Sequence, residues 1–392
     1  MTDIPEVVLQ TDELLAEARR LESMVDFGPD HFRPALEVLI KALNEEAGLN
    51  AVGRFTHYQR ILNSLRNRLR MQAWLERHPE ILDEEIHSPV VIVGLARTGT
   101  TLLHRILAND DRFHAPLWYE VRNPAPYMDW NAAGVDQRLE EAKSEIDTLL
   151  AVNPEFAAIH PMDPLGADEE ILLLEHSFYS YVPNAFANVP SYTKHVQTHD
   201  NLPAYRYLKQ QLQLLQWQKK QRGESAERWL LKTPHHLHFM NQLLRVFPDA
   251  QIVATHRDPT LSIPSITSMN YNLRITGADA PNKLEVAREW SELFADGVRH
   301  TMAVRQNVEQ QFFDVWFEDT IARPFDVIAK MYEFLEMPFT PIVRAAMEKH
   351  TEANKREDRP THEYTLEEYG YTAAGIASQF EEYCARFINA RN

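Results

Sequence analysis

Three things that define whole classes of protein are scarce in this sequence: cysteine, long apolar runs and positive charge. Among the 392 residues there is one cysteine, Cys384, which excludes an internal disulfide and a zinc finger or iron–sulfur cluster built on cysteines. No apolar run approaches the roughly 18 residues of a membrane-spanning helix. Lys and Arg number 40 against 57 Asp and Glu, and the net charge of −17 argues against binding to nucleic acid.

The remaining composition is that of an ordinary globular protein, with 44% hydrophobic and 25% charged residues. The N-terminal segment MTDIPEVVLQTDELL has neither the basic start nor the unbroken apolar stretch of a signal peptide. We therefore expect a soluble, cytoplasmic protein without a transmembrane segment. At about 100–200 residues per domain, the length allows two or three domains, or one large α/β domain with additions.

The order of the predicted elements favours an α/β fold. Residues 1–87 are predicted to form a helical N-terminal region, because apolar residues recur at helical spacing and no strand pattern occurs. Beyond them, four short apolar runs alternate with helical stretches, at 88–96, 228–232, 250–256 and 312–317. This alternation predicts a parallel central sheet within residues 88–392, interrupted by a helical insertion at about 115–225.

The segment VVIVGLARTGTTLLHRIL carries a loop suited to an anion. Gly94 and Gly99 have the spacing of the phosphate-binding pattern G-x-x-x-x-G-K-[ST], but Thr100 stands where that pattern has lysine, and Arg97 is the nearby cation. Backbone N–H groups, a helix N-terminus and threonine hydroxyls all favour an anionic group there. We expect this loop to bind a phosphate-like group without hydrolysing ATP; the alternative is a tight turn whose glycines serve geometry alone.

Two further polar groups follow later strands, and open α/β sheets bind ligands at such strand ends. After the second run come Lys232, Thr233, His235 and His236, and after the third comes Arg257. If a helix begins near Ser262, Pro264 lies in its first turn and Ser265 can face the same anion as Arg257.

Four ordered segments together resemble a sulfotransferase that uses 3′-phosphoadenosine 5′-phosphosulfate (PAPS), of the broad bacterial branch. They are GLARTGTTLL, LLKTPHH, HRDP…S and WFEDTIARPFDVIAKMYEFL. The resemblance implies a P-loop-like three-layer sandwich with the insertion on the substrate side. It also implies transfer of a sulfuryl group from PAPS to the hydroxyl of an alcohol or phenol, with release of 3′-phosphoadenosine 5′-phosphate.

The same resemblance assigns roles to residues of the nucleotide site. The 5′-phosphosulfate would be held by Arg97, Thr98, Gly99, Thr100 and Thr101. Arg257 and Ser265 would hold the 3′-phosphate, and Phe317 would lie against the adenine. A C-terminal basic loop closes the site in many members, and here Lys355 with Arg356 are the candidates; the alternative is a charged surface loop.

For the chemical step, the candidates are Arg97 and Lys232 as cations that stabilise the developing charge, and His235 as the base. Many members read Lys-Thr-His where this chain reads Lys-Thr-Pro-His, so His235 is shifted by one residue. The alternative base is Glu170, in ADEEILLLEHSF. His236 should point away from His235 and matter little.

Two other functions compete with sulfuryl transfer: a small-molecule kinase, which needs a lysine after the glycine and an acidic Mg²⁺ site, and a catalytically inactive nucleotide-binding protein. No metal is expected, because His235, His236 and His238 cannot converge on one ion. Residues 177–196 are dense in aromatics and suit either a pocket wall or a long surface-packed loop. The expected acceptor is a small, partly apolar alcohol or phenol; the sequence does not determine the oligomeric state.

Overall fold

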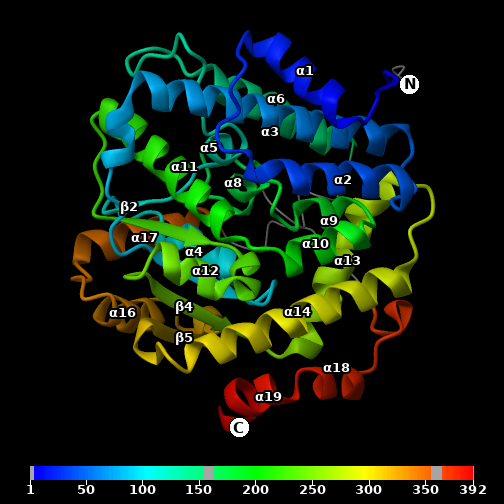
Figure 1. The fold of residues 1–392 in the computed structure, drawn as a ribbon. Coiled ribbons are helices and arrows are strands. Elements are labelled where there is room, and N and C mark those ends of the chain that lie inside the picture. Colours follow the sequence, from blue (N-terminus) through cyan, green and yellow to red (C-terminus); the bar gives the residue numbers. More distant parts are fainter. Residues whose placement is uncertain (1–3, 153–161, 355–363, 392) are drawn as a thin grey trace.

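The computed structural model describes residues 4–152, 162–354 and 364–391, and its strands form one parallel sheet (Figure 1). The strands are β1 (Val90–Gly94), β2 (Phe113–His114), β3 (Arg228–Lys232), β4 (Gln251–His256) and β5 (Phe312–Trp316), in the order β2-β3-β1-β4-β5. The predicted α/β fold with a parallel sheet is confirmed. The sequence pattern does not predict β2, because two residues are too few to show a period.

Helices cover both faces of this sheet. Before the sheet come α1 (Thr11–Glu22), α2 (Arg33–Glu45) and α3 (Ala51–Arg77), and after β1 comes α4 (Thr100–Leu107). Between β2 and β3 lie α5 (Trp118–Arg122), α6 (Gln137–Val152), α8 (Ile171–Glu175), α9 (Val182–Phe186), α10 (Pro190–Thr198) and α11 (Leu202–Gln221). After β3 come the 3₁₀ segment η3 (Pro234–His238) and α12 (Met240–Val246), and after β4 come α13 (Pro259–Gly277) and α14 (Lys283–Arg305). After β5 come α15 (Phe317–Ala322), α16 (Pro324–Phe334), α17 (Pro341–Ala353), α18 (Ala373–Gln379) and α19 (Glu381–Tyr383).

Alternate residues of the central strand face two separate hydrophobic cores, as the pleat of a strand requires. Val90 and Ile92 pack in the core that also holds side chains of α4, α16 and α17. Val91 and Val93 join the larger core, to which α11, α12 and α14 contribute. All of β1 is buried, which explains why its sequence is a continuous apolar run rather than an alternating one.

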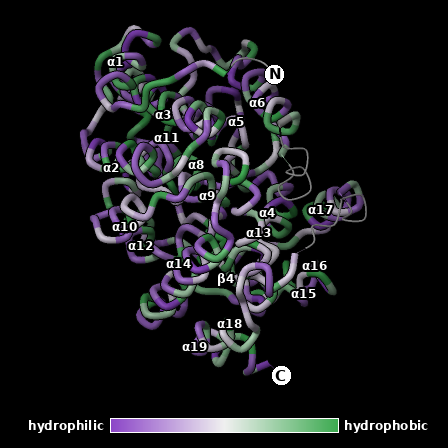
Figure 2. The backbone as a smooth tube through the Cα atoms, turned by 90° about the vertical axis from the view of Figure 1, so that its right-hand side faces the viewer, coloured by the Kyte–Doolittle hydropathy of each residue, from purple (hydrophilic) through white to green (hydrophobic). Residues whose placement is uncertain are grey.

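The helices before the sheet pack on other helices from several parts of the chain. Helix α2 packs on α10 of the insertion, and α3 packs on α1 and on α13, which follows β4. Figure 1 and the view turned by 90° in Figure 2 both place α1 at one end of the molecule and the α18–α19 segment at the other.

Helix α13 begins earlier than the sequence pattern predicts, at Pro259 instead of near Ser262. The Asp258 side chain accepts a hydrogen bond from the main-chain N–H of Thr260 and so caps the helix. Pro259 occupies the first turn, where its missing N–H costs nothing. Pro264 therefore lies inside the helix and not in its first turn.

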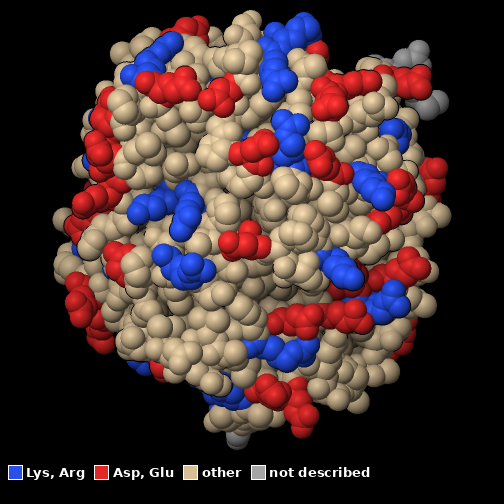
Figure 3. Space-filling model, in the orientation of Figure 1, with Lys and Arg blue, Asp and Glu red and all other residues tan. Residues whose placement is uncertain are grey.

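The surface carries charges of both signs. On the face shown in Figure 3, acidic and basic side chains are interspersed among larger uncharged areas. Within the described ranges, no helix is both long and apolar enough to cross a membrane.

Candidate active site

The segments predicted to carry the chemistry begin where four adjacent strands end. The β1–α4 loop follows β1, η3 follows β3, α13 follows β4 and α15 follows β5. These strands are parallel neighbours in the sheet, so their carboxyl ends lie along one edge. That edge is where the site forms.

The β1–α4 loop has a backbone that side chains rarely adopt. Arg97 and Gly99 both have positive φ, of 69° and 84°. A left-handed conformation costs a non-glycine residue about 1–2 kcal/mol, and strain of this kind clusters at functional sites. A Cβ atom on Gly99 would lie 3.0 Å from the ring of Phe317, so the loop packs closely against α15. The first N–H groups of α4 follow directly and have no partner within the helix, which suits an anion.

Thr98 braces this loop from inside. Its hydroxyl lies 2.6 Å from the main-chain oxygen of Leu95 and 2.6 Å from Oγ1 of Thr255, near the end of β4. A Cβ atom on Gly94 would collide with the same Thr255 hydroxyl. The Thr98 hydroxyl therefore ties the loop to β4.

Four residues assigned to the nucleotide from the sequence lie together in the structure. Nε of Arg97 donates to Oγ of Ser265 at 3.2 Å, and Nη1 of Arg257 donates to the main-chain oxygen of Arg97 at 2.8 Å. The Arg257 guanidinium also lies over the Phe317 ring, 4.1 Å from its centroid. Two guanidinium groups, which bind phosphate in bidentate fashion, thus stand beside the N-terminus of α4.

At the end of β3, Lys232 reaches the same loop. Its Nζ lies 3.2 Å from Oγ1 of Thr101 and 2.5 Å from Oε1 of Glu169. The Lys232 side chain is 1% exposed, whereas that of Glu169 is 21% exposed. A buried ammonium is stable only with a charged partner, and Glu169 supplies it. An ammonium, a hydroxyl of the first turn of α4 and a partly exposed carboxylate therefore form one cluster.

Glu170, the neighbour of Glu169, is fully buried and fully engaged. Its Oε2 accepts from the main-chain N–H of Lys232 at 2.7 Å, and its Oε1 lies 2.7 Å from Nε2 of His236. Nδ1 of His236 lies 2.7 Å from the hydroxyl of Tyr205, on α11. Burial opposes ionisation of Glu170, but the hydrogen bond and charge of His236 outweigh it and lower the pKa of this carboxyl. His236 does point away from His235, as expected, but into a buried network tied to Lys232.

His235 lies in a different setting. Its ring packs against Tyr181 in an edge-to-face contact and against Phe239, with centroids 4.9 Å apart in both pairs. Within the described part of the chain neither ring nitrogen has a hydrogen-bond partner, and the Tyr181 hydroxyl also lacks one. Burial, followed by the charges of His236 and His238, holds the pKa of His235 well below its usual range. The ring is therefore neutral near pH 7.

The remaining assigned residues divide into two groups. Thr100 is the first residue of α4 and is buried, so its main-chain N–H belongs to the helix N-terminus, where such groups have no partner within the helix. Lys355 and Arg356 lie outside the described residues.

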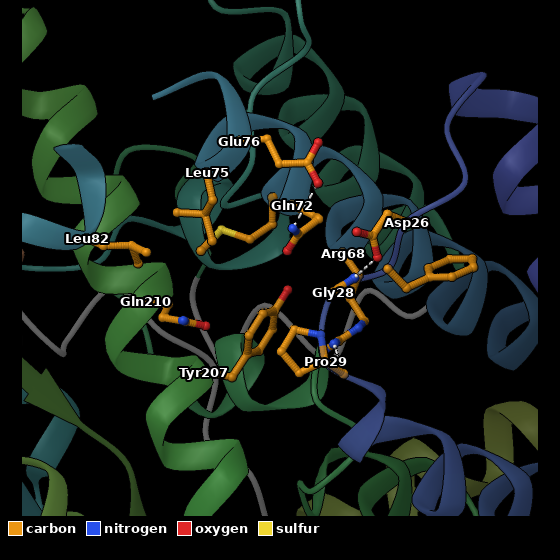
Figure 4. A pocket seen from close by; sticks show the side chains of 12 residues that line it. Asp26, Gly28, Pro29, Arg68, Gln72, Leu75, Glu76, Leu82, Tyr207 and Gln210 are labelled. Atoms are coloured by element: carbon orange, nitrogen blue, oxygen red, sulfur yellow. Dashed lines mark hydrogen bonds between the residues drawn. The ribbon is translucent and has the colours of Figure 1, made fainter. Parts of the chain in front are cut away.

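A cavity of about 410 Å³ lies elsewhere, between α3, α11 and residues 26–29 (Figure 4). Tyr207 and Gln210 of α11 and Gln72 of α3 point into it. Arg68 lines it and is fully buried, with its guanidinium 4.4 Å from the Tyr207 ring centroid. The described site residues named above do not line this cavity. The candidate active site is thus defined by converging side chains at the sheet edge.

Sequence reasoning missed one member of the cluster, Tyr205. The DEE sequence before an apolar run marks Glu169 and Glu170 together as acidic candidates, but it does not show which of the two contacts the Lys232 ammonium. Tyr205 lies 31 residues before His236, inside a long helix, and no local pattern marks it. Only the tertiary packing of α11, which contacts α8 and α12, brings its hydroxyl to His236.

A protein-family model described as the sulfotransferase family matches residues 89–341. The match begins just before β1 and includes the loop, η3 and the start of α13. Two curated relatives are the omega-hydroxy-beta-dihydromenaquinone-9 sulfotransferases Stf3 of Mycobacterium bovis and Mycobacterium tuberculosis. Each is 26% identical over 287 residues, which are 71% of this chain and 70% of the relative.

Solved structures give the same picture over nearly the whole chain. The sulfotransferase STF1 from Mycobacterium tuberculosis H37Rv is 28% identical, with a TM-score of 0.81, over 97% of this chain and 100% of that one. The sulfotransferase STF9 from Mycobacterium avium is 24% identical, with a TM-score of 0.87, over 98% of both chains. The second likeness establishes the fold alone.

Proposed function

The chain belongs to the sulfotransferase family, and from that premise we propose that it transfers the sulfuryl group of PAPS to the hydroxyl of a partly apolar alcohol or phenol. In this reaction the acceptor oxygen forms a bond to sulfur, and the bond from sulfur to the 5′-phosphate oxygen breaks. The acceptor proton passes to a base, and 3′-phosphoadenosine 5′-phosphate leaves. The observation that carries the proposal is the meeting of Lys232, Thr101, Arg97 and Arg257 at the edge of the sheet.

The nucleotide would lie across the carboxyl ends of β1, β4 and β5. Main-chain N–H groups of residues 98–101 would hold the 5′-phosphosulfate. Arg257 and Ser265 would take the 3′-phosphate, and Phe317 would contact the adenine. This assignment is supported by the contacts of Arg97 with Ser265 and of Arg257 with Phe317. Arg97 and Lys232 would stabilise the charge that develops on the leaving phosphate oxygen.

We further propose Glu169 as the base, ahead of His235 and Glu170. Glu169 is partly exposed, so an acceptor hydroxyl can approach it, and it contacts Lys232, which stands at the transfer site. Glu170 is fully buried, and both of its oxygens are already engaged. The His235 ring is enclosed by aromatic side chains, and burial lowers its pKa, which makes it a weak base.

The acceptor is proposed to be a lipophilic molecule with a reactive hydroxyl. The Stf3 relatives are named for sulfuryl transfer to omega-hydroxy-beta-dihydromenaquinone-9, a menaquinone-derived compound with an omega-hydroxyl group. In this chain, the aromatic-rich segment 177–196 places Tyr181 against His235, which lies three residues beyond the end of β3. An apolar acceptor body lying along this segment would present its hydroxyl to Glu169.

The proposal is tested by calorimetric titration with 3′-phosphoadenosine 5′-phosphate and, separately, with ATP. A sulfotransferase binds the first much more tightly, whereas a kinase prefers the second. Turnover of labelled PAPS with a panel of long-chain alcohols, phenols and sterols then separates an enzyme from an inactive nucleotide-binding protein. Tight binding of ATP with no binding of the 3′,5′-bisphosphate would overturn the proposal.

Arg257→Ala tests the 3′-phosphate site. A hydrogen bond to a charged group is worth about 1.5–3 kcal/mol, so binding of the 3′,5′-bisphosphate should weaken by about one to two decades. Binding of 5′-AMP, which lacks the 3′-phosphate, should change little. Equal losses for the two nucleotides in calorimetry would show that Arg257 serves the loop structure instead.

Glu169→Gln tests the base. The substitution keeps the shape and removes the basic oxygen, so kcat should fall by about 10²–10⁴-fold while affinity for 3′-phosphoadenosine 5′-phosphate is retained. Glu76→Gln, a change of an exposed acid at the cavity of Figure 4, is the matched control and should leave kcat unchanged. If Glu169→Gln turns over normally and His235→Ala is inactive, the base is His235.

A further inference from the structure

A hydrogen-bonded chain of side chains connects the interior of the insertion to the end of β3. It runs from the Tyr205 hydroxyl to Nδ1 of His236, from Nε2 of His236 to Oε1 of Glu170, and from Oε2 of Glu170 to the main-chain N–H of Lys232. Each of these three contacts is 2.7 Å long. The side chains of His236 and Glu170 are 0% exposed, and Tyr205 is 1% exposed.

The hydrogen-bonding groups limit the directions of these contacts. The Lys232 N–H can only donate, so Oε2 of Glu170 accepts. If the Tyr205 hydroxyl donates to Nδ1 of His236, then Nε2 carries a proton and donates to Oε1 of Glu170. The Glu170 carboxylate then has a hydrogen-bond donor on each of its oxygens. The chain is thus satisfied internally, and no member has a free position to offer a substrate.

The two ends of the chain control the reaction side of the cluster. Lys232 is the last residue of β3, and its main-chain N–H is held by Glu170 while its ammonium reaches Thr101 and Glu169. Glu170 is also the residue before α8, so its position fixes that of Glu169 next to it. One buried carboxylate therefore sets both the cation and the proposed base.

We propose that Tyr205, His236 and Glu170 act as positioning residues. They hold the Lys232 ammonium and the Glu169 carboxylate in the relative positions that sulfuryl transfer requires. This inference rests on the proposed function for its catalytic consequence. It makes His236 a positioning residue, which the place of His236 next to His235 in the sequence does not indicate. None of the three side chains has to touch a substrate.

Two substitutions of His236 separate positioning from simple packing. Gln places an amide N–H where Nε2 stands, so His236→Gln keeps the donor to Glu170; Asn reaches only the Nδ1 position, so His236→Asn loses it. We expect kcat to fall about tenfold or more in His236→Asn and by less than about threefold in His236→Gln. Binding of 3′-phosphoadenosine 5′-phosphate should change by less than about threefold in both.

Tyr205→Phe removes the outer end of the chain and should lower kcat by about two- to fivefold, because His236 keeps its bond to Glu170 but loses the group that orients it. Tyr207→Phe is the matched control. Tyr207 is a buried tyrosine two residues further along α11 whose ring faces the cavity of Figure 4 and Arg68. It should leave kcat unchanged.

A readout that needs no sulfuryl transfer comes from the pH dependence of unfolding. The groups around Glu170 that carry or gain charge come from several elements. They are His104 of α4, Tyr205 of α11, Lys232 at the end of β3, His236 in η3, and Asp168 and Glu169 directly before Glu170 in the sequence. In the parent protein the Glu170 pKa lies below that of an unfolded glutamate, so its contribution to stability is present above about pH 4.3 and is lost on acidification. Without the His236 donor, burial dominates and raises the pKa of Glu170. The contribution of this carboxyl to the free energy of unfolding then falls as the pH rises. The difference in unfolding midpoint between the parent protein and His236→Asn should therefore widen from pH 5 to pH 8. For His236→Gln, the difference from the parent should stay constant over this range.

The outcomes are separable. The positioning role is supported if the difference in unfolding midpoint widens with pH and if kcat falls more in His236→Asn than in His236→Gln. Parallel unfolding curves for both variants, or equal kcat losses in both, would overturn it. If the parent protein turns over no PAPS with any acceptor, the proposed function fails, and the unfolding curves still decide whether the chain holds Glu170 as described.

Discussion

His235 and His236 are neighbours in the chain, both almost completely buried, and they meet opposite surroundings. Both ring nitrogens of His236 lie 2.7 Å from a partner, one a carboxylate and one a hydroxyl. His235 is 2% exposed and packs against Tyr181 and Phe239, and within the described residues its nitrogens have no partner. Equal burial thus accompanies a satisfied ring on one side and an unsatisfied ring on the other.

The difference shows which side of the site is held by internal hydrogen bonds and which side has buried polar atoms without partners. Buried polar atoms without partners are rare, and near a reaction centre they are commonly completed by water or by a ligand. The His236 side resembles a core: every donor has an acceptor, and a change there disturbs Lys232. The His235 side has polar atoms to spare beside aromatic rings, which suits contact with an acceptor molecule.

The strongest way to break this comparison is to replace each histidine with leucine and measure urea unfolding at pH 7. His236→Leu leaves the Glu170 carboxylate buried without its partner, so the free energy of unfolding should fall by about 3–5 kcal/mol. His235→Leu removes no hydrogen bond seen in the structure and should change it by less than about 1 kcal/mol. Similar losses in both variants would mean that His235 has a partner of comparable strength.

The next effect is a pH dependence carried by His235. Its pKa in the folded protein is far below that of an unfolded histidine, so below about pH 6.5 the unfolded chain binds a proton that the folded one does not. Its contribution to the free energy of unfolding is therefore about 1.4 kcal/mol lower at pH 5.5 than at neutral pH and above. His235→Leu should remove this loss, so its stability relative to the parent rises as the pH falls. Other buried histidines, such as His57 and His104, keep their share in both proteins.

The smallest effect sharpens the same contrast with two tyrosines. The Tyr181 hydroxyl has no partner within the described residues, whereas that of Tyr205 bonds to His236. Tyr181→Phe should leave the free energy of unfolding unchanged or raise it slightly, and Tyr205→Phe should lower it by about 1 kcal/mol. Thermal unfolding at pH 7 measures both. A loss in Tyr181→Phe as large as that in Tyr205→Phe would place a bound water on the His235 side.

Most of the sheet could be predicted because its signal is local. Strand β1 is an unbroken apolar run, and β3, β4 and β5 are largely apolar with a few polar residues, because buried parallel strands need no strict alternation. The start of α13 was harder to predict, because Asp258 and Pro259 together form a cap that outweighs the later apolar pattern. The loop after β1 was recognisable from the spacing of Gly94 and Gly99, and Gly99 does adopt a positive φ.

The nucleotide side of the site was predictable in part. Arg97, Arg257 and Ser265 each follow a strand at the same sheet edge, so their meeting follows from the topology. The resemblance assigned Thr98 to the 5′-phosphosulfate, and its hydroxyl favoured an anionic group there. In the structure it bonds to Leu95 and Thr255, because a tight loop needs its own internal donors.

By itself, the sequence determined the parallel α/β fold, the anion loop and the set of cations around it, since apolar runs, glycine spacing and strand-end positions are written in consecutive residues. Only the tertiary structure decided which carboxylate pairs with Lys232 and which histidine supports it. Glu169 and Lys232 lie 63 residues apart, Glu170 and His236 lie 66 apart, and Tyr205 comes from a third element. Hydrogen-bond partners at such separations depend on how helices pack and on which polar atoms are left to satisfy after burial, and no short stretch of sequence carries that information.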